Sequence, residues 1–159
     1  MAKIHILAPG TLKETYWRDA IGEYTRRLTP FCQIDVREMK ESRLQDHPSA
    51  AQIQDALEEE GRAILEAVPP RSALVALCIE GKLLNSEELS AAMEQFFMTT
   101  DEITFVIGSS YGLSDQVKQK ANLRLSLGRM TFPHQMVRVM LHEIIYRCFT
   151  IQKGLKYHK

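Results

Sequence analysis

The chain has 159 residues, enough for one domain with its own core, and its 45% hydrophobic and 25% charged residues are typical of globular proteins. Lysine and arginine together number 20, as do aspartate and glutamate, so the formal net charge is zero. A free-standing nucleic-acid binder usually carries a basic excess, and the balance argues against that class, although the C-terminal third is locally basic.

The sequence gives no sign of a membrane span, a secretion signal or a metal site. No apolar run approaches the roughly 20 residues that a membrane span needs, and Pro9-Gly10 interrupts the first apolar run. The three cysteines lie far apart and form no Cys-x-x-Cys pair, which argues against zinc and disulfides. We therefore expect a cytoplasmic protein without membrane contact and without a bound metal.

Apolar periodicity predicts five strand–helix units in chain order. The predicted strands are residues 3–7, 32–36, 72–79, 103–107 and 123–127. The predicted helices are residues 13–28, 50–68, 85–98, 114–121 and 134–151. A polar loop is expected over residues 39–49, Gly81 is expected to stop the third strand, and Asn85 to Glu88 has a capping-box pattern.

This alternation predicts one α/β domain over residues 1–159, with an open, mostly parallel sheet of five to six strands and helices on both faces. Ligands of such folds bind beyond the carboxyl ends of the strands. The loops to consider are therefore residues 79–83, 108–113 and 127–133.

Common catalytic motifs are absent from these loops. There is no Gly-x-Gly-x-x-Gly fingerprint, no phosphate-binding loop before Gly81-Lys82, and no Gly-x-Ser-x-Gly elbow. What remains is the small-residue loop Gly108–Gly112, whose glycines would let backbone approach a ligand closely, and the block from Leu125 to Arg138. In that block Pro133 suits a helix start and makes the preceding loop stiff, next to His134 and Arg138.

The block Met130-Thr131-Phe132-Pro133-His134-Gln135, the downstream Arg138-Val139 and the ending Tyr157-His158-Lys159 resemble the ribosomal large subunit methyltransferase H family. The resemblance extends over essentially the whole chain and includes Glu60-Gly61. It implies a SPOUT-class fold with a deep C-terminal trefoil knot, a homodimer, and S-adenosylmethionine as cofactor. It also implies methylation of N3 of a pseudouridine in 23S rRNA, on the assembled ribosome.

The resemblance also implies which residues line the cofactor pocket. They are Leu77, Gly108, Leu127, Gly128, Arg129, Met130, Thr131 and Phe132. Family members commonly have a second glycine where this chain has Ser109, and a positive φ there would strain a serine.

The N3–H of a uracil-like ring must lose its proton, so a base or an anion stabiliser is required. We expect His134 to act as the base and Arg138 to hold the phosphate or the developing anion. Tyr157 and His158 of the tail are expected to grip the nucleotide, from the same chain or from the partner subunit.

Alternatives remain open for both the residues and the whole chain. His134 could be an ordinary first-turn residue, Arg138 could pair with a nearby carboxylate, and His142 is expected at a surface or interface. Glu143 and Arg147 have the spacing of a helical salt bridge. The whole chain could instead be a non-catalytic ribosome-binding protein or a related tRNA methyltransferase.

Overall fold

The computed structural model describes residues 1–159 and contains one sheet of five strands, in the order β2-β1-β4-β3-β5. All neighbouring pairs are parallel, which confirms the predicted open α/β sheet. The strands are β1 (Ala2–Pro9), β2 (Cys32–Met39), β3 (Ala73–Leu83), β4 (Glu102–Val106) and β5 (Leu123–Ser126).

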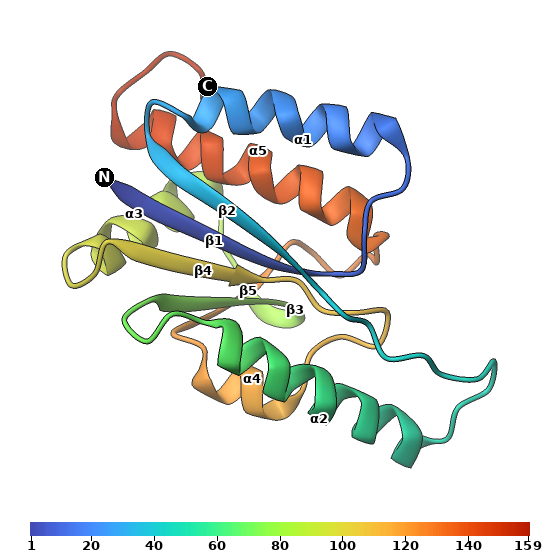
Figure 1. Ribbon diagram of the computed structural model, residues 1–159. Helices are drawn as coiled ribbons and strands as arrows, with labels where there is room; N and C mark the ends of the chain where they lie inside the picture. Colours follow the sequence, from blue (N-terminus) through green and yellow to red (C-terminus); the bar gives the residue numbers. More distant parts are fainter.

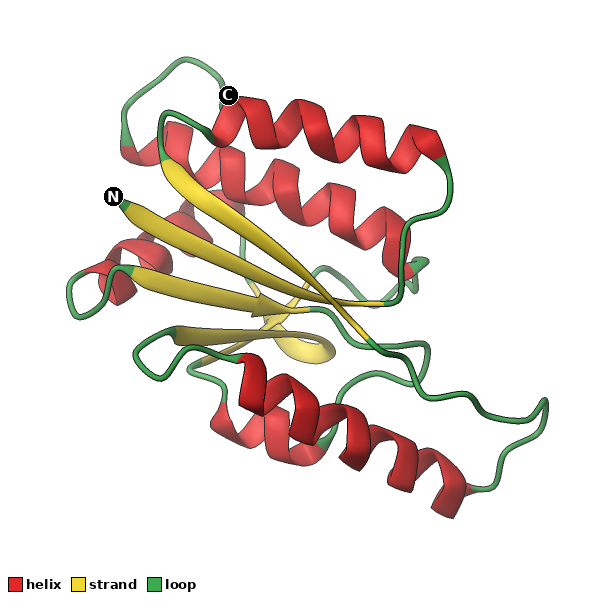
Figure 2. Cartoon of the chain, viewed as in Figure 1, coloured by secondary structure: helices red, strands yellow, loops and turns green.

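Helices cover both faces of the sheet, as predicted (Figures 1 and 2). The helices are α1 (Thr15–Leu28), α2 (Ala50–Ala67), α3 (Ser86–Phe97), α4 (Asp115–Lys120) and α5 (His134–Gln152). Helices α1, α3 and α5 lie on one face, and α2 and α4 lie on the other. The predicted capping box of α3 is confirmed: Asn85 accepts a hydrogen bond from the Glu88 amide, and the Glu88 side chain accepts one from the Asn85 amide. No helix has both the length and the apolarity needed to cross a membrane.

The alternating side chains of the central strands build two cores. On the α1/α3/α5 face, Phe105 of β4 belongs to a cluster with Met93 of α3 and Leu141 of α5, all fully buried. On the other face, Val106 belongs to a smaller cluster with Val117 of α4. Because helices bury both faces of the sheet, the sequences of β1, β3 and β4 are nearly continuous apolar runs.

The prediction that Gly81 ends the third strand is wrong, because β3 continues to Leu83. The register of β3 against β5 shifts between Leu77 and Lys82, so residues 78–81 bulge from the ladder. A Cβ at Gly81 would lie 2.8 Å from the backbone of Arg124, so only glycine permits this approach. Glycine here permits a bulge rather than a turn.

The parallel arrangement brings the carboxyl ends of β1, β2, β4 and β5 to the same region of the molecule (Figure 1). The loop after β2 projects from this region before it enters α2. The C-terminal trefoil knot implied by the resemblance stays a prediction.

Candidate functional site

A cleft of about 840 Å³ opens beyond the carboxyl ends of the strands. Its walls are the β3 bulge at residues 78–80, the loop 108–113 after β4, the loop 127–133 after β5, and the first turn of α5. Half of its lining residues are hydrophobic, and its volume lies within the range of small-molecule and cofactor sites.

The loop after β4 is a tight turn that needs its glycines. The Gly112 amide donates to the Ser109 carbonyl at 2.9 Å, and Gly112 has a φ of 93°. A Cβ on Gly108 would lie 2.6 Å from the Gly112 carbonyl. At Gly108 and Gly112 the loop therefore presents backbone without a side chain to the cleft.

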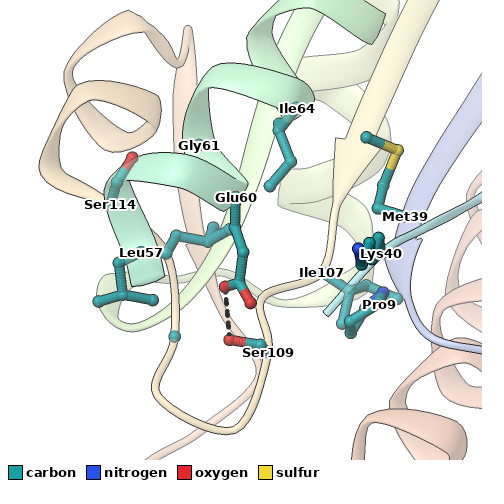
Figure 3. A pocket seen from close by; sticks show the side chains of 12 residues that line it. Pro9, Met39, Lys40, Leu57, Glu60, Gly61, Ile64, Ile107, Ser109 and Ser114 are labelled. Atoms are coloured by element: carbon teal, nitrogen blue, oxygen red, sulfur yellow. Dashed lines mark hydrogen bonds between the residues drawn. The ribbon is translucent and has the colours of Figure 1, made fainter. Parts of the chain in front are cut away.

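Ser109 has no positive φ, so its backbone carries no left-handed strain. Its hydroxyl donates to Oε1 of Glu60 on α2, at 2.9 Å (Figure 3). The serine that departs from the family pattern is thus accommodated by a specific hydrogen bond.

The loop after β5 combines a glycine turn with apolar side chains that line the cleft. Gly128 has a φ of 126°, and its amide donates to the hydroxyl of Ser126 at 3.1 Å. Met130 and Phe132 line the cleft, and Met130 is largely exposed. Pro133 directly precedes α5 and has an extended ψ of 142°, so the helix begins at His134 as predicted.

The structure brings seven of the eight predicted cofactor residues together on the cleft wall. They are Leu77, Gly108, Leu127, Gly128, Met130, Thr131 and Phe132. The eighth, Arg129, is exposed and lies outside the lining. Contact of these residues with a cofactor stays a prediction.

His134 lies in the cleft wall with its ring mostly buried. Its Nε2 is 3.9 Å from a carboxylate oxygen of Glu41, and its buried Nδ1 has no hydrogen-bond partner. Burial lowers the pKa of His134 and outweighs the opposing effect of Glu41, with nearby Arg138 lowering it further. The ring is therefore neutral near pH 7 and has a lone pair available to accept a proton.

Arg138 is only 1% exposed and is not among the residues that line the cleft. Its guanidinium donates to the Glu38 carboxylate at 2.7 Å, to the Pro9 carbonyl at 2.7 Å and to the Gly10 carbonyl at 2.6 Å. The carboxylate pairing named as the alternative is thus present. Arg138 fastens α5 to the ends of β1 and β2, and its terminal nitrogens are engaged within the chain.

The tail packs on the C-terminal half of α5. The Tyr157 hydroxyl donates to Glu143 at 2.8 Å, and His158 contacts Glu87 at 2.7 Å and Arg147 at 3.2 Å. Glu143 lies nine residues beyond His134, about 14 Å along the helix axis. Neither Tyr157 nor His158 lines the cleft of its own chain, and the predicted Glu143–Arg147 pair is confirmed.

Sequence reasoning misplaced His142, which is fully buried rather than at the surface, with Nδ1 2.6 Å from the Arg138 carbonyl. It included Glu80 in the loop 79–83 but missed the cleft residues Cys78 and Lys118, the second of which forms an ion pair with Glu80. The signal for Cys78 was Gly81, which permits the bulge of residues 78–81, whereas Lys118 lies on α4 and no sequence signal marked it. No group of three or more His, Cys, Asp or Glu side chains is placed to hold a metal ion.

The fold and cleft define an α/β protein that binds a small molecule at the carboxyl edge of a parallel sheet. Residues 2–158 match the family described as "Predicted SPOUT methyltransferase", and the chain belongs to this SPOUT methyltransferase family.

Two solved structures resemble this chain in fold. One is a protein from Legionella pneumophila classed as a methyltransferase and solved with the cofactor SAM; its TM-score is 0.50 at 10% identity, over 95% of this chain and 66% of that one. The other is a methylase-family protein from Haemophilus influenzae Rd KW20, with a TM-score of 0.51 at 13% identity, over 99% of this chain and 70% of that one. This chain thus spans about two thirds of the length of these proteins, and the likeness shows the fold.

Proposed function

We propose that this chain transfers a methyl group from S-adenosylmethionine to N3 of a pseudouridine in 23S rRNA, on the assembled ribosome in the cytoplasm. This is the activity of the ribosomal large subunit methyltransferase H family, which the sequence resembles. One observation carries the proposal: the glycine loop after β4, the apolar loop after β5 and His134 line a single cleft.

The cleft suits an adenosine-containing cofactor. Leu77, Leu127 and Phe132 offer apolar walls for the base, and the Gly108 and Gly128 backbones offer hydrogen-bonding groups without side chains in the way. The Legionella pneumophila protein was solved with SAM bound, and we assign the same cofactor here. When bound, S-adenosylmethionine supplies an electrophilic methyl group.

The chain's own residues supply position and a proton acceptor. His134, neutral and mostly buried, accepts the N3 proton of the nucleotide. Arg138 holds the Pro9-Gly10 turn and α5 in place rather than touching RNA. Exposed Arg129, beside the cleft, is placed to meet a phosphate.

The proposed contact of the tail with the nucleotide requires a second copy of the chain. Because Tyr157 and His158 lie far from the cleft of their own chain, they reach a nucleotide only if a homodimer places the tail of one subunit beside the cleft of the other. We therefore propose a homodimer with composite sites.

The test combines cofactor binding with methyl transfer. Calorimetric titration with S-adenosylhomocysteine is expected to show one site per chain. Radiolabelled S-adenosylmethionine should label 23S rRNA in intact ribosomes that lack the modification, but not free 23S rRNA or tRNA. His134→Gln should bind S-adenosylhomocysteine normally yet transfer methyl groups at least about 100-fold more slowly. Full turnover of this variant would remove His134 from the mechanism.

The same experiment separates the alternatives. A non-catalytic ribosome-binding protein would bind ribosomes without binding S-adenosylhomocysteine. Ser109 was the feature that favoured this non-catalytic alternative, and it no longer supports it because the Ser109 backbone is unstrained. Label in free tRNA would keep the methyltransferase and overturn the ribosomal substrate.

A further inference from the structure

Glu60 of α2 joins two segments that are far apart in the sequence, and Figure 3 shows its contact with one of them, at Ser109. Its Oε1 accepts a hydrogen bond from the Ser109 hydroxyl at 2.9 Å, in the loop after β4. Its Oε2 accepts one from the Ser42 amide at 2.8 Å, in the loop after β2. Each oxygen of one half-buried carboxylate thus holds a different loop.

The contact to Ser109 is the main anchor of the glycine loop. Apart from the bond within its own turn, residues 108–112 make no other hydrogen bond to the chain than the one from Ser109 to Glu60. Ser109 itself lines the cleft. Movement of Glu60 would therefore move the wall on which the cofactor is proposed to lie.

Helix α2 is a rigid support for this carboxylate. Gly61, the next residue, packs so closely on α4 that an added Cβ would lie 3.0 Å from Cβ of Ser114. The absence of a side chain at position 61 lets α2 approach the start of α4. Glu60 is thus fixed relative to the loop that leads into α4.

The second contact reaches the other side of the site. Ser42 follows Glu41, whose carboxylate is 3.9 Å from Nε2 of His134. Through Ser42, Glu60 therefore holds the segment that faces the proposed base. One side chain links the cofactor wall to the surroundings of the proton acceptor.

We propose that Glu60 is a positioning residue that couples the cofactor loop 108–112 to the segment 40–44, so that cofactor affinity and the setting of His134 depend on one carboxylate. The inference rests on the proposed cofactor site. Glu60 touches neither the cofactor nor the nucleotide and acts through Ser109 and Ser42.

The test measures S-adenosylhomocysteine affinity by calorimetry in a set of variants. Glu60→Ala and Ser109→Ala are each expected to weaken binding about tenfold, or about 1.4 kcal/mol. The double variant should be no weaker than Glu60→Ala, because the two changes remove the same contact. The matched control is Glu59→Ala, which removes the neighbouring exposed carboxylate and should leave affinity unchanged.

Conservative rescue distinguishes hydrogen bonding from charge. In Glu60→Gln the amide oxygen can accept from the Ser42 amide while the NH₂ group donates to the Ser109 hydroxyl. This variant is expected to bind within about twofold of the wild type, because both contacts persist. Loss of affinity in Glu60→Gln equal to that in Glu60→Ala would overturn the hydrogen-bond account.

Hydrogen exchange tests the coupling itself. In the wild type, S-adenosylhomocysteine should slow amide exchange in both segments, 108–112 and 40–44. In Glu60→Ala it should still slow exchange in 108–112 but no longer in 40–44. Unchanged protection of 40–44 in that variant, or affinity equal to that of Glu59→Ala, overturns the coupling.

The outcomes separate this inference from the proposed function. If the wild type does not bind S-adenosylhomocysteine, the proposed cofactor site and the coupling are both refuted. If the wild type and the variants bind S-adenosylhomocysteine equally well, only the coupling is refuted. If Glu60→Ala does not fold, Ser109→Ala decides, since it removes a single hydroxyl, and normal binding by that variant refutes the inference.

Discussion

Replacing Arg138 with methionine tests what the buried guanidinium contributes. Methionine has a similar length and fills the same space without a donor. The Pro9 and Gly10 carbonyls then lose the guanidinium that lies 2.7 and 2.6 Å from them, and the Glu38 carboxylate loses its partner.

The geometry divides the expected loss between these contacts. Each buried carbonyl left without a donor costs about 1–3 kcal/mol. The side chain of Glu38 is 40% exposed and can turn to water, but that of Arg138 is only 1% exposed and depends on this carboxylate for its countercharge. We expect Arg138→Met to lower the free energy of unfolding by about 3–5 kcal/mol. Glu38→Gln keeps an oxygen that can accept from the guanidinium but removes the countercharge, so it should lower the free energy of unfolding by a smaller amount, about 1–3 kcal/mol.

Urea unfolding followed by far-UV circular dichroism measures both values, with the slope against urea checked for constancy. Equal losses in Arg138→Met and Glu38→Gln would show that the ion pair dominates and that the division above is wrong. A loss below about 1 kcal/mol in Arg138→Met would refute the structural role and return Arg138 to the candidates for RNA contact.

Three further predictions follow from the site and the core. Gly108→Ala would place a Cβ 2.6 Å from the Gly112 carbonyl, so the turn must open, and calorimetry should show S-adenosylhomocysteine binding weakened at least about tenfold. Burial lowers the pKa of His142, so below about pH 6.5 the unfolded chain takes up a proton that the folded chain does not. Stability in urea should therefore fall as the pH drops below that value, and His142→Gln should reduce this slope. Burial raises the pKa of the Cys32 thiol to about 11 and that of the Cys148 thiol to about 12, and both side chains are buried. Burial also raises the pKa of Cys78, but this thiol is partly exposed in the cleft. Alkylation of the native protein near pH 8, read by mass spectrometry, should therefore modify only Cys78, and S-adenosylhomocysteine should slow that reaction.

The elements of the fold could be read from local patterns. The apolar run before Ile79, the capping signal at Asn85 and the proline before α5 each act within a few residues, so the strand–helix order and the helix boundaries were predictable. The first three strands extend past their predicted ends, to Pro9, Met39 and Leu83. Gly81 was the exception among these signals. Its role depends on the backbone of β5, which lies about 40 positions away in the sequence but touches it in the fold.

The candidate cleft was partly predictable because the carboxyl ends of parallel strands meet at one edge. That rule pointed in advance to residues 79–83 and to the loops after β4 and β5 as the parts of the chain that meet at the site. It did not predict that residues 78–81 would be a bulge within β3, or that Glu60 would reach Ser109 and Ser42.

By itself, the sequence determined the α/β class, the alternation of elements and the loops that form the cleft, because these follow from local periodicity and from the position of strand ends. Only the tertiary structure decided that Arg138 is buried against the ends of β1 and β2, that His142 is buried and that the tail rests on α5. Arg138 meets the Pro9 carbonyl, 129 residues away, and His158 meets Glu87, 71 residues away. No pattern within a single helix or strand contains that information.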